Sequence, residues 1–156
     1  MKKNKIIKKF IYLISPNEIK NKNFYTNLAL VLSSGKISYF QLRLKKETSK
    51  NKLIIGKKIK KICNKYKVKF LINDDPLLAK KLNADGCHLG QKDMDLVKAR
   101  TILKKKIIGV TCHNSINLAK IAIEGGADYL AFGAFYTSKT KTVKYKASLK
   151  ILESVK

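Results

Sequence analysis

The chain has 156 residues, 45% of them hydrophobic, and a formal net charge of +25. This length suits a single domain over residues 1–156, and no apolar run approaches the roughly 20 residues that a membrane span needs. Arginine occurs only at positions 43 and 100. Because specific contacts with bases and phosphates favour arginine, we expect no specific nucleic-acid partner, only salt-sensitive nonspecific binding.

The first predicted element is a strand over residues 8–15. The start, MKKNKIIKKFIYLISP, is basic and then apolar like an export signal. Its apolar part is short, however, Pro16 follows it closely, and no small-residue cleavage site is present. We therefore interpret it as a strand of a cytoplasmic protein.

Apolar runs rich in Ile, Val, Leu, Phe and Tyr alternate with segments of helical period along the rest of the chain. The predicted strands cover residues 8–15, 38–44, 69–73, 86–89, 107–112 and 129–135. The predicted helices cover residues 17–34, 49–66, 76–83, 95–104, 115–125 and 147–156. Asp75 before Pro76 is typical of a helix start, and Gly125-Gly126 of a helix end.

Strand and helix alternate six times, which predicts an α/β fold with a parallel sheet and helices packed outside it. Ligands of such folds bind at the carboxyl ends of the strands. Within YFQLRLKK, side chains 41, 43 and 45 share one face of the predicted strand. The polar residues expected at the strand ends are Gln41, Arg43, Lys45, Asn73, Asp74, Gln91, Asp93, Thr111, Ser138, Thr140 and Lys141.

These side chains suit a magnesium–diphosphate. Two carboxylates, Asp74 and Asp93, can share a metal with phosphate oxygens, while arginine and lysine hold the remaining charge. The hydroxyls and amides of the TSKT segment can cradle a second phosphate. Each residue also has a structural interpretation: Asp93 as the cap of the fourth helix, Asp74 as part of a tight turn, and Lys45 as a surface lysine.

Cys63, Cys87 and Cys112 form no CxxC pair, and their odd number favours a reduced protein. Two Cys-His steps occur, at 87–88 and 112–113. Neighbouring strand residues face opposite ways, so each step offers one ligand, and two ligands fall short of the four of a structural zinc site. We therefore expect these residues in the core or at its rim, with His113 close to the strand ends.

Several segments together resemble the thiamine phosphate synthase family. They are QLRLK, LINDDPLLAKKLNADGCHLGQKD, IIGVTCHN and GADYLAFGAFYTSKTK, in that order along the chain. The resemblance implies a TIM (β/α)8-barrel type of fold. It also implies a transferase that couples hydroxymethylpyrimidine diphosphate to a thiazole phosphate and releases pyrophosphate.

The resemblance also implies roles for individual residues. Substrate-binding residues would be Gln41, Arg43, Lys45, Asn73, Thr111, Ser138, Lys139, Thr140 and Lys141, of which Arg43, Lys45, Thr111 and Lys141 would also be catalytic. Asp74 and Asp93 would hold Mg2+ on the diphosphate. Thr111 stands where the family usually has serine. The pyrimidine diphosphate would ionise before the thiazole nitrogen attacks, with no protein nucleophile.

The chain departs from this family in three places. It continues only briefly beyond the sixth loop, so the barrel is expected to be shortened to about six strand–helix units, and pairing with a second copy is one way to close the core. Threonine at 137 and Lys139 replace prolines. Two alternatives therefore stay open: a non-catalytic or decayed relative that still binds the diphosphate, and a thiazole tautomerase on the same scaffold.

Overall fold

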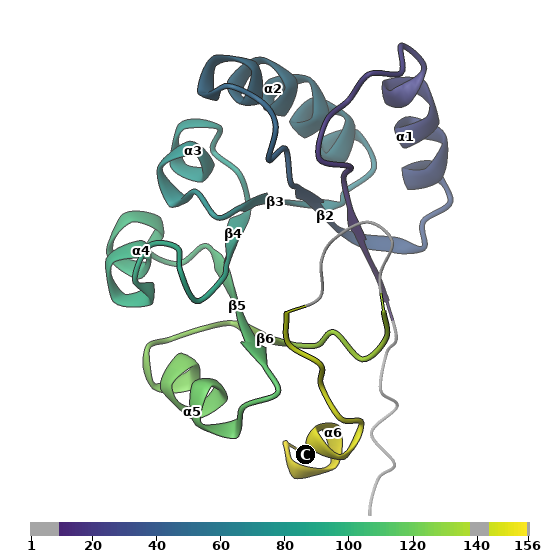
Figure 1. Cartoon of the computed structure of the whole chain (residues 1–156). Coiled ribbons are helices and arrows are strands. Elements are labelled where there is room, and N and C mark those ends of the chain that lie inside the picture. Colours follow the sequence, from purple (N-terminus) through teal and green to yellow (C-terminus); the bar gives the residue numbers. More distant parts are fainter. Residues whose placement is uncertain (1–9, 138–143, 156) are drawn as a thin grey trace, which may run out of the picture. The chain divides into compact units, whose positions relative to one another are not determined.

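The computed structural model describes residues 10–137 and 144–155 (Figure 1). The chain divides into two compact units, Met1–Phe70 and Leu71–Lys156. Within the described residues, strands and helices alternate. In chain order they are β1 (Ile11–Ile14), α1 (Phe24–Ser33), β2 (Ile37–Leu42), α2 (Ser49–Lys65), β3 (Lys69–Asn73), α3 (Pro76–Lys81), β4 (Gly86–Leu89), α4 (Leu96–Leu103), β5 (Ile107–His113), α5 (Ile116–Glu124), β6 (Tyr129–Phe132) and α6 (Lys150–Ser154).

The first unit contains the parallel pair β1–β2 and the helices α1 and α2. Alternating residues of β2 and the following turn enter its core: Phe40, Leu42 and Leu44 are each less than 5% exposed. The rings of Phe40 and Phe70 stack at 6.5 Å. Helix α2 begins where the Thr48 side chain accepts the Asn51 N–H, and it buries a narrow stripe that includes Ile59. Its other faces carry lysines, as expected of a helix with one side in water.

The second unit contains β3 from Leu71 onward and the strands β4 to β6, and β3 pairs in parallel with β4, β4 with β5, and β5 with β6. The helices α3, α4 and α5 lie outside these strands (Figure 1). Each of the three begins at a residue whose side chain accepts a backbone N–H of the first turn: Asp75, Asp95 and Ser115. These caps satisfy donors that a helix leaves without an intrahelical partner, so they fix where each strand–helix loop ends.

A short segment after residue 143 also packs in the second unit. The Ala134 N–H donates to the Tyr145 carbonyl at 3.1 Å, and the Ala147 N–H donates to the Ala134 carbonyl at 2.9 Å. The Ser148 N–H donates to Asn114 Oδ1 at 3.1 Å. Ala147 and Ile151 are buried, so this segment and α6 belong to the core of the unit.

The predicted order of elements is confirmed, but several bounds differ. Pro76 opens α3 as expected, and Gly126, at φ +84°, follows α5. The helix predicted at 17–34 begins only at Phe24, because Asn21 holds the Asn23 N–H in a turn. The strand predicted at 129–135 ends at Phe132. Among the described residues, no helix combines the length and apolarity needed to cross a membrane.

Candidate functional site

In the first unit, Gln41 lies near the carboxyl end of β2 and is 3% exposed. Its side-chain oxygen accepts the Tyr12 hydroxyl proton at 3.2 Å, and its backbone carbonyl accepts the Ser15 N–H at 2.9 Å. A buried amide with such partners has a fixed orientation, because leaving it unbonded would be costly. Gln41 is therefore placed by β1 as well as by its own strand.

The predicted strand 38–44 included Arg43, but in the structure Arg43 lies just after the strand. Strand β2 ends at Leu42, because the Arg43 N–H donates to Ser15 Oγ at 2.8 Å. The guanidinium donates to Asn17 Oδ1, in the loop after β1. A guanidinium carries five N–H donors, so this bond orients the fork without using it up. Lys45 follows in the exposed loop before α2.

In the second unit, the neighbouring aspartates Asp74 and Asp75 follow β3 and have different structural roles. The Asp75 carboxylate accepts the Leu78 N–H at 2.9 Å and caps α3. Asp74 has φ 65°, in the left-handed region that aspartate tolerates better than most residues, and its N–H donates to the His88 carbonyl at 2.8 Å. Such conformations gather at functional sites. Asn73 ends β3 directly before them.

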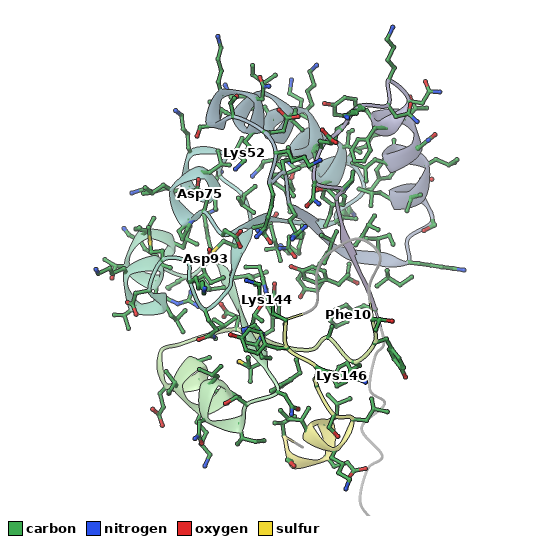
Figure 2. All side chains as sticks on the ribbon, viewed as in Figure 1. Phe10, Lys52, Asp75, Asp93, Lys144 and Lys146 are labelled. Carbon is green, nitrogen blue, oxygen red and sulfur yellow. The ribbon has the colours of Figure 1, made fainter. Side chains whose placement is uncertain are left out.

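Asp93 lies in the loop between β4 and α4, and Figure 2 labels it and Asp75, which precedes α3. Its Oδ2 accepts the Gly90 N–H at 2.6 Å, and its own N–H donates to the Gly90 carbonyl at 3.2 Å. The interpretation of Asp93 as the cap of the fourth helix is wrong, because Asp95 caps α4. Asp93 instead belongs to a tight turn that presents a carboxylate just after β4.

The carboxylates of Asp74 and Asp93 follow neighbouring strands, β3 and β4. No group of three His, Cys, Asp or Glu residues that could hold a metal occurs within the described ranges. Mg2+ is commonly held by only one or two carboxylates, with water and substrate phosphates as the other ligands. The chemistry of the two aspartates therefore fits a magnesium ion that arrives with a diphosphate.

A row of three polar side chains crosses the strands of the second unit. His88 Nε2 lies 2.8 Å from Thr111 Oγ1, and His88 Nδ1 lies 2.9 Å from the Tyr129 hydroxyl. The rings of His88 and Tyr129 stack at 5.6 Å. The Gln91 amide also donates to the Thr111 carbonyl at 2.5 Å. Thr111 is thus held through both its side chain and its backbone.

His88 and Tyr129 are the residues that sequence reasoning missed at this site. His88 alternates with the fully buried Cys87 along β4, which indicated that it faces the other way but gave no partner. His113, expected close to the strand ends, has φ 51° and stacks on Tyr145 at 4.0 Å. Ser138, Lys139, Thr140 and Lys141 lie outside the described residues, so their expected roles stay predictions.

The cysteines are buried and free of disulfides. Burial raises the pKa of the Cys87 thiol from 9.0 to about 12; Arg100 opposes this shift, and the nearby aspartates add to it. Burial also raises the pKa of Cys112. A nucleophilic cysteine needs a lowered pKa and some exposure, so these thiols are unsuited to covalent catalysis. Their expected place in the core is confirmed.

Comparison with known proteins places these residues in a family. The sequence profile described as thiamine monophosphate synthase matches residues 11–156. The chain is 83% identical over 156 residues to the thiamine-phosphate synthase of Pelagibacter ubique strain HTCC1062, and covers 75% of that protein. It is 41% identical over 147 residues to the thiamine-phosphate synthase of Marinobacter nauticus, covering 94% of this chain and 66% of that protein.

A solved structure shows the same fold. The thiamine phosphate pyrophosphorylase of Pyrococcus furiosus superposes with a TM-score of 0.77 at 28% identity, over 94% of this chain and 71% of that one. The expected fold class, α/β of the TIM-barrel type, is confirmed by this match.

Proposed function

Because the chain belongs to the thiamine monophosphate synthase family, and so to the transferases of thiamine biosynthesis, we propose that it joins hydroxymethylpyrimidine diphosphate to a thiazole phosphate. The products would be thiamine phosphate and pyrophosphate. The observation that carries this proposal is the placement of the family's motif residues. Those that the structure describes lie at or just after the carboxyl ends of strands, where this fold class binds its ligands.

The first unit would hold the diphosphate through positive charge. The Arg43 guanidinium, oriented by Asn17, offers a planar fork that matches two phosphate oxygens, and Lys45 adds a point charge. The buried Gln41 amide, fixed by Tyr12, would hydrogen-bond to the pyrimidine. Holding the departing pyrophosphate more strongly than the intact diphosphate is what would accelerate bond breaking.

The second unit would supply the ligands of the metal. Asp74 and Asp93 would hold Mg2+, which when bound neutralises phosphate charge and so makes pyrophosphate a better leaving group. Asn73 would bind the diphosphate beside them, and Thr111 would lie near the reacting pyrimidine. No protein nucleophile is needed, because an aminopyrimidine can stabilise a cation on its methylene group.

The remaining proposals concern the setting of the reaction. The three cysteines are buried and form no disulfide, which supports a reducing compartment, and we propose the cytoplasm. The substrates would be small molecules. Pairing with a second copy stays a prediction, and light scattering of the purified chain measures it directly.

The decisive experiment assays the purified 156-residue chain with both heterocycles, with and without Mg2+. Formation of thiamine phosphate and pyrophosphate only with Mg2+ is the expected result. Diphosphate binding without turnover would contradict the synthase assignment and support the non-catalytic alternative. Conversion of a thiazole tautomer without use of the diphosphate would support the tautomerase alternative.

Two neighbouring aspartates offer a matched pair of variants for the metal. Asp74→Asn keeps a side chain that tolerates a positive φ but removes a carboxylate charge, so we expect Mg2+-dependent activity to fall by about 10²–10³-fold. Asp75→Asn keeps a good helix cap, so activity should stay within about twofold. Equal effects of the two changes would refute the assignment of Asp74 to the metal.

A further inference from the structure

We propose that Tyr129 and His88 are positioning residues that turn the Thr111 hydroxyl proton toward the substrate. The proposal rests on the proposed function, in which Thr111 lies near the reacting pyrimidine and the departing pyrophosphate. Tyr129 lies at the far end of the row, and it would act through His88 and Thr111 and not by touching the substrate.

Both ring nitrogens of His88 have an oxygen within hydrogen-bond distance, Thr111 Oγ1 at 2.8 Å and the Tyr129 hydroxyl at 2.9 Å. A neutral imidazole has one donor nitrogen and one acceptor nitrogen. Two arrangements are therefore compatible with these distances. Either the proton is on Nε2, and Tyr129 donates to Nδ1, or it is on Nδ1, and Thr111 donates to Nε2.

The acidity of the two hydroxyls decides between the arrangements. A phenol ionises near pH 10, whereas an aliphatic alcohol is a far weaker acid, so tyrosine is the better donor to an imidazole nitrogen. Tyr129 then donates to Nδ1, and the proton on Nε2 is donated to Thr111 Oγ1. Because Thr111 accepts this bond, its own O–H can be donated to another acceptor. A pyrophosphate oxygen that gains charge as it departs is such an acceptor.

The sequence provides the space that this row needs. Gly109 lies opposite Tyr129 in the register of β5 and β6. A Cβ at position 109 would lie 1.9 Å from Tyr129 Cζ, so any larger residue would displace the ring. Gly109 and Thr111 are two residues apart on one strand and share a face. The tyrosine hydroxyl therefore reaches His88 only because position 109 has no side chain.

The arrangement of protons can be measured without substrate. In 15N NMR spectra of the histidine-labelled chain, we expect His88 to carry its proton on Nε2, with Nδ1 as an acceptor. A His113→Gln sample assigns the signals, because the chain has two histidines. In Tyr129→Phe, the His88 Nδ1 signal should shift toward the value of an imidazole nitrogen that accepts no hydrogen bond. A proton on Nδ1 in the unmodified chain, or no shift in Tyr129→Phe, would overturn the proposal.

Kinetics supply the second readout. Tyr129→Phe should lower kcat about tenfold and change KM less than twofold, because the Thr111 proton matters most as charge develops. Tyr66→Phe, at the end of α2, should change neither constant. A change in KM alone, or an unchanged kcat, would contradict a positioning role.

Gly109→Ala tests the same row with Tyr129 still present. It should displace the ring and reproduce both the Nδ1 shift and the loss of kcat. Wild-type activity in a folded Gly109→Ala chain would argue against the proposal, and if this variant does not fold, Tyr129→Phe alone decides. An inactive unmodified chain would refute the proposed function, whereas the NMR result would still accept or reject the arrangement of protons.

Discussion

The two units differ sharply in charge, and the difference matches what each would do with a diphosphate. Residues 10–70 contain fifteen lysines and arginines but only two acidic residues, Glu18 and Glu47, whereas eight of the chain's ten acidic residues follow residue 70. The first unit holds the arginine fork and the buried amide of Gln41. The second holds the carboxylates suited to a metal. In the proposed function, anion binding and metal binding would therefore fall to different parts of one chain.

Within the second unit, the acidic residues also divide by function. Asp75 and Asp95 cap helices, and Asp128 accepts bonds from Arg100 and from the Ile108 N–H. Asp74 and Asp93 do not cap helices and lie at the carboxyl ends of strands. Asp75 and Asp95 lie on the same side, at the starts of the helices that follow these strands, whereas Asp128 lies at the other end, just before β6. In this fold class, ligand-binding residues gather at the carboxyl ends of the strands.

The largest effect on activity is expected from a substitution in the proposed anion site of the first unit. Arg43→Ala removes the fork and should lower kcat/KM by about 10²–10³-fold, as loss of a donor to developing charge commonly does. Binding of inorganic pyrophosphate, measured by calorimetry, should weaken in parallel.

Lys46→Ala is the matched control for this change. Lys46 lies in the same loop, is exposed, and approaches Glu18 at 3.5 Å, a surface pair of little energetic value. Its loss should leave kcat/KM within about twofold. Equal losses in both variants would mean that general positive charge, and not the arginine fork, binds the diphosphate.

A smaller effect, on stability, is expected from a substitution of Arg100 in the second unit. The Arg100 guanidinium donates to the Asp128 carboxylate and to the carbonyls of Lys104, Lys106 and Gly126, each within 2.6 Å. Arg100→Ala leaves these acceptors with one partner fewer, so we expect it to lower the free energy of unfolding by about 2 kcal/mol and the Tm by about 4–8 °C.

The activity of folded Arg100→Ala at 25 °C should be unchanged, since none of these contacts reaches a strand's carboxyl end. Lys98→Ala, exposed on the same helix, should change neither stability nor activity measurably. A Tm within about 1 °C of the unmodified chain would show that the Arg100 bonds contribute little.

Local signals in the sequence predicted much of the fold. The start of α3 follows from Asp75 and Pro76, because a cap acts within its own turn. The end of β2 could not be predicted this way. The Arg43 N–H bonds to Ser15, 28 residues earlier, and such a contact leaves no mark in the alternation of apolar side chains.

For the candidate site, too, the features that depend on local order were predictable and those that depend on long-range contacts were not. Placing Asp74 and Asp93 after strands needed only the order of elements. The environment of Thr111 depends on His88, 23 residues earlier in the sequence, and the environment of His88 depends on Tyr129, which is 41 residues after His88. Only the register of the parallel strands brings the three together, and the sequence pattern does not set that register.

The smallest expected effect concerns Cys87, whose thiol lies in the second unit near Asp75, Asp74 and Asp93. Its pKa rises from 9.0 to about 12 on folding, chiefly through burial. The folded thiol therefore keeps its proton where the unfolded one loses it. The stabilisation is complete below pH 9 and is lost as the pH rises toward 12.

Urea unfolding at pH 8, 9 and 10 should show this dependence. Cys87→Ala lowers the stability at every pH through lost packing, but its stability should fall less steeply between pH 8 and 10 than that of the unmodified chain. Parallel slopes would mean that Cys87 ionises alike in both states. They would contradict a buried, protonated thiol among the aspartates of the second unit.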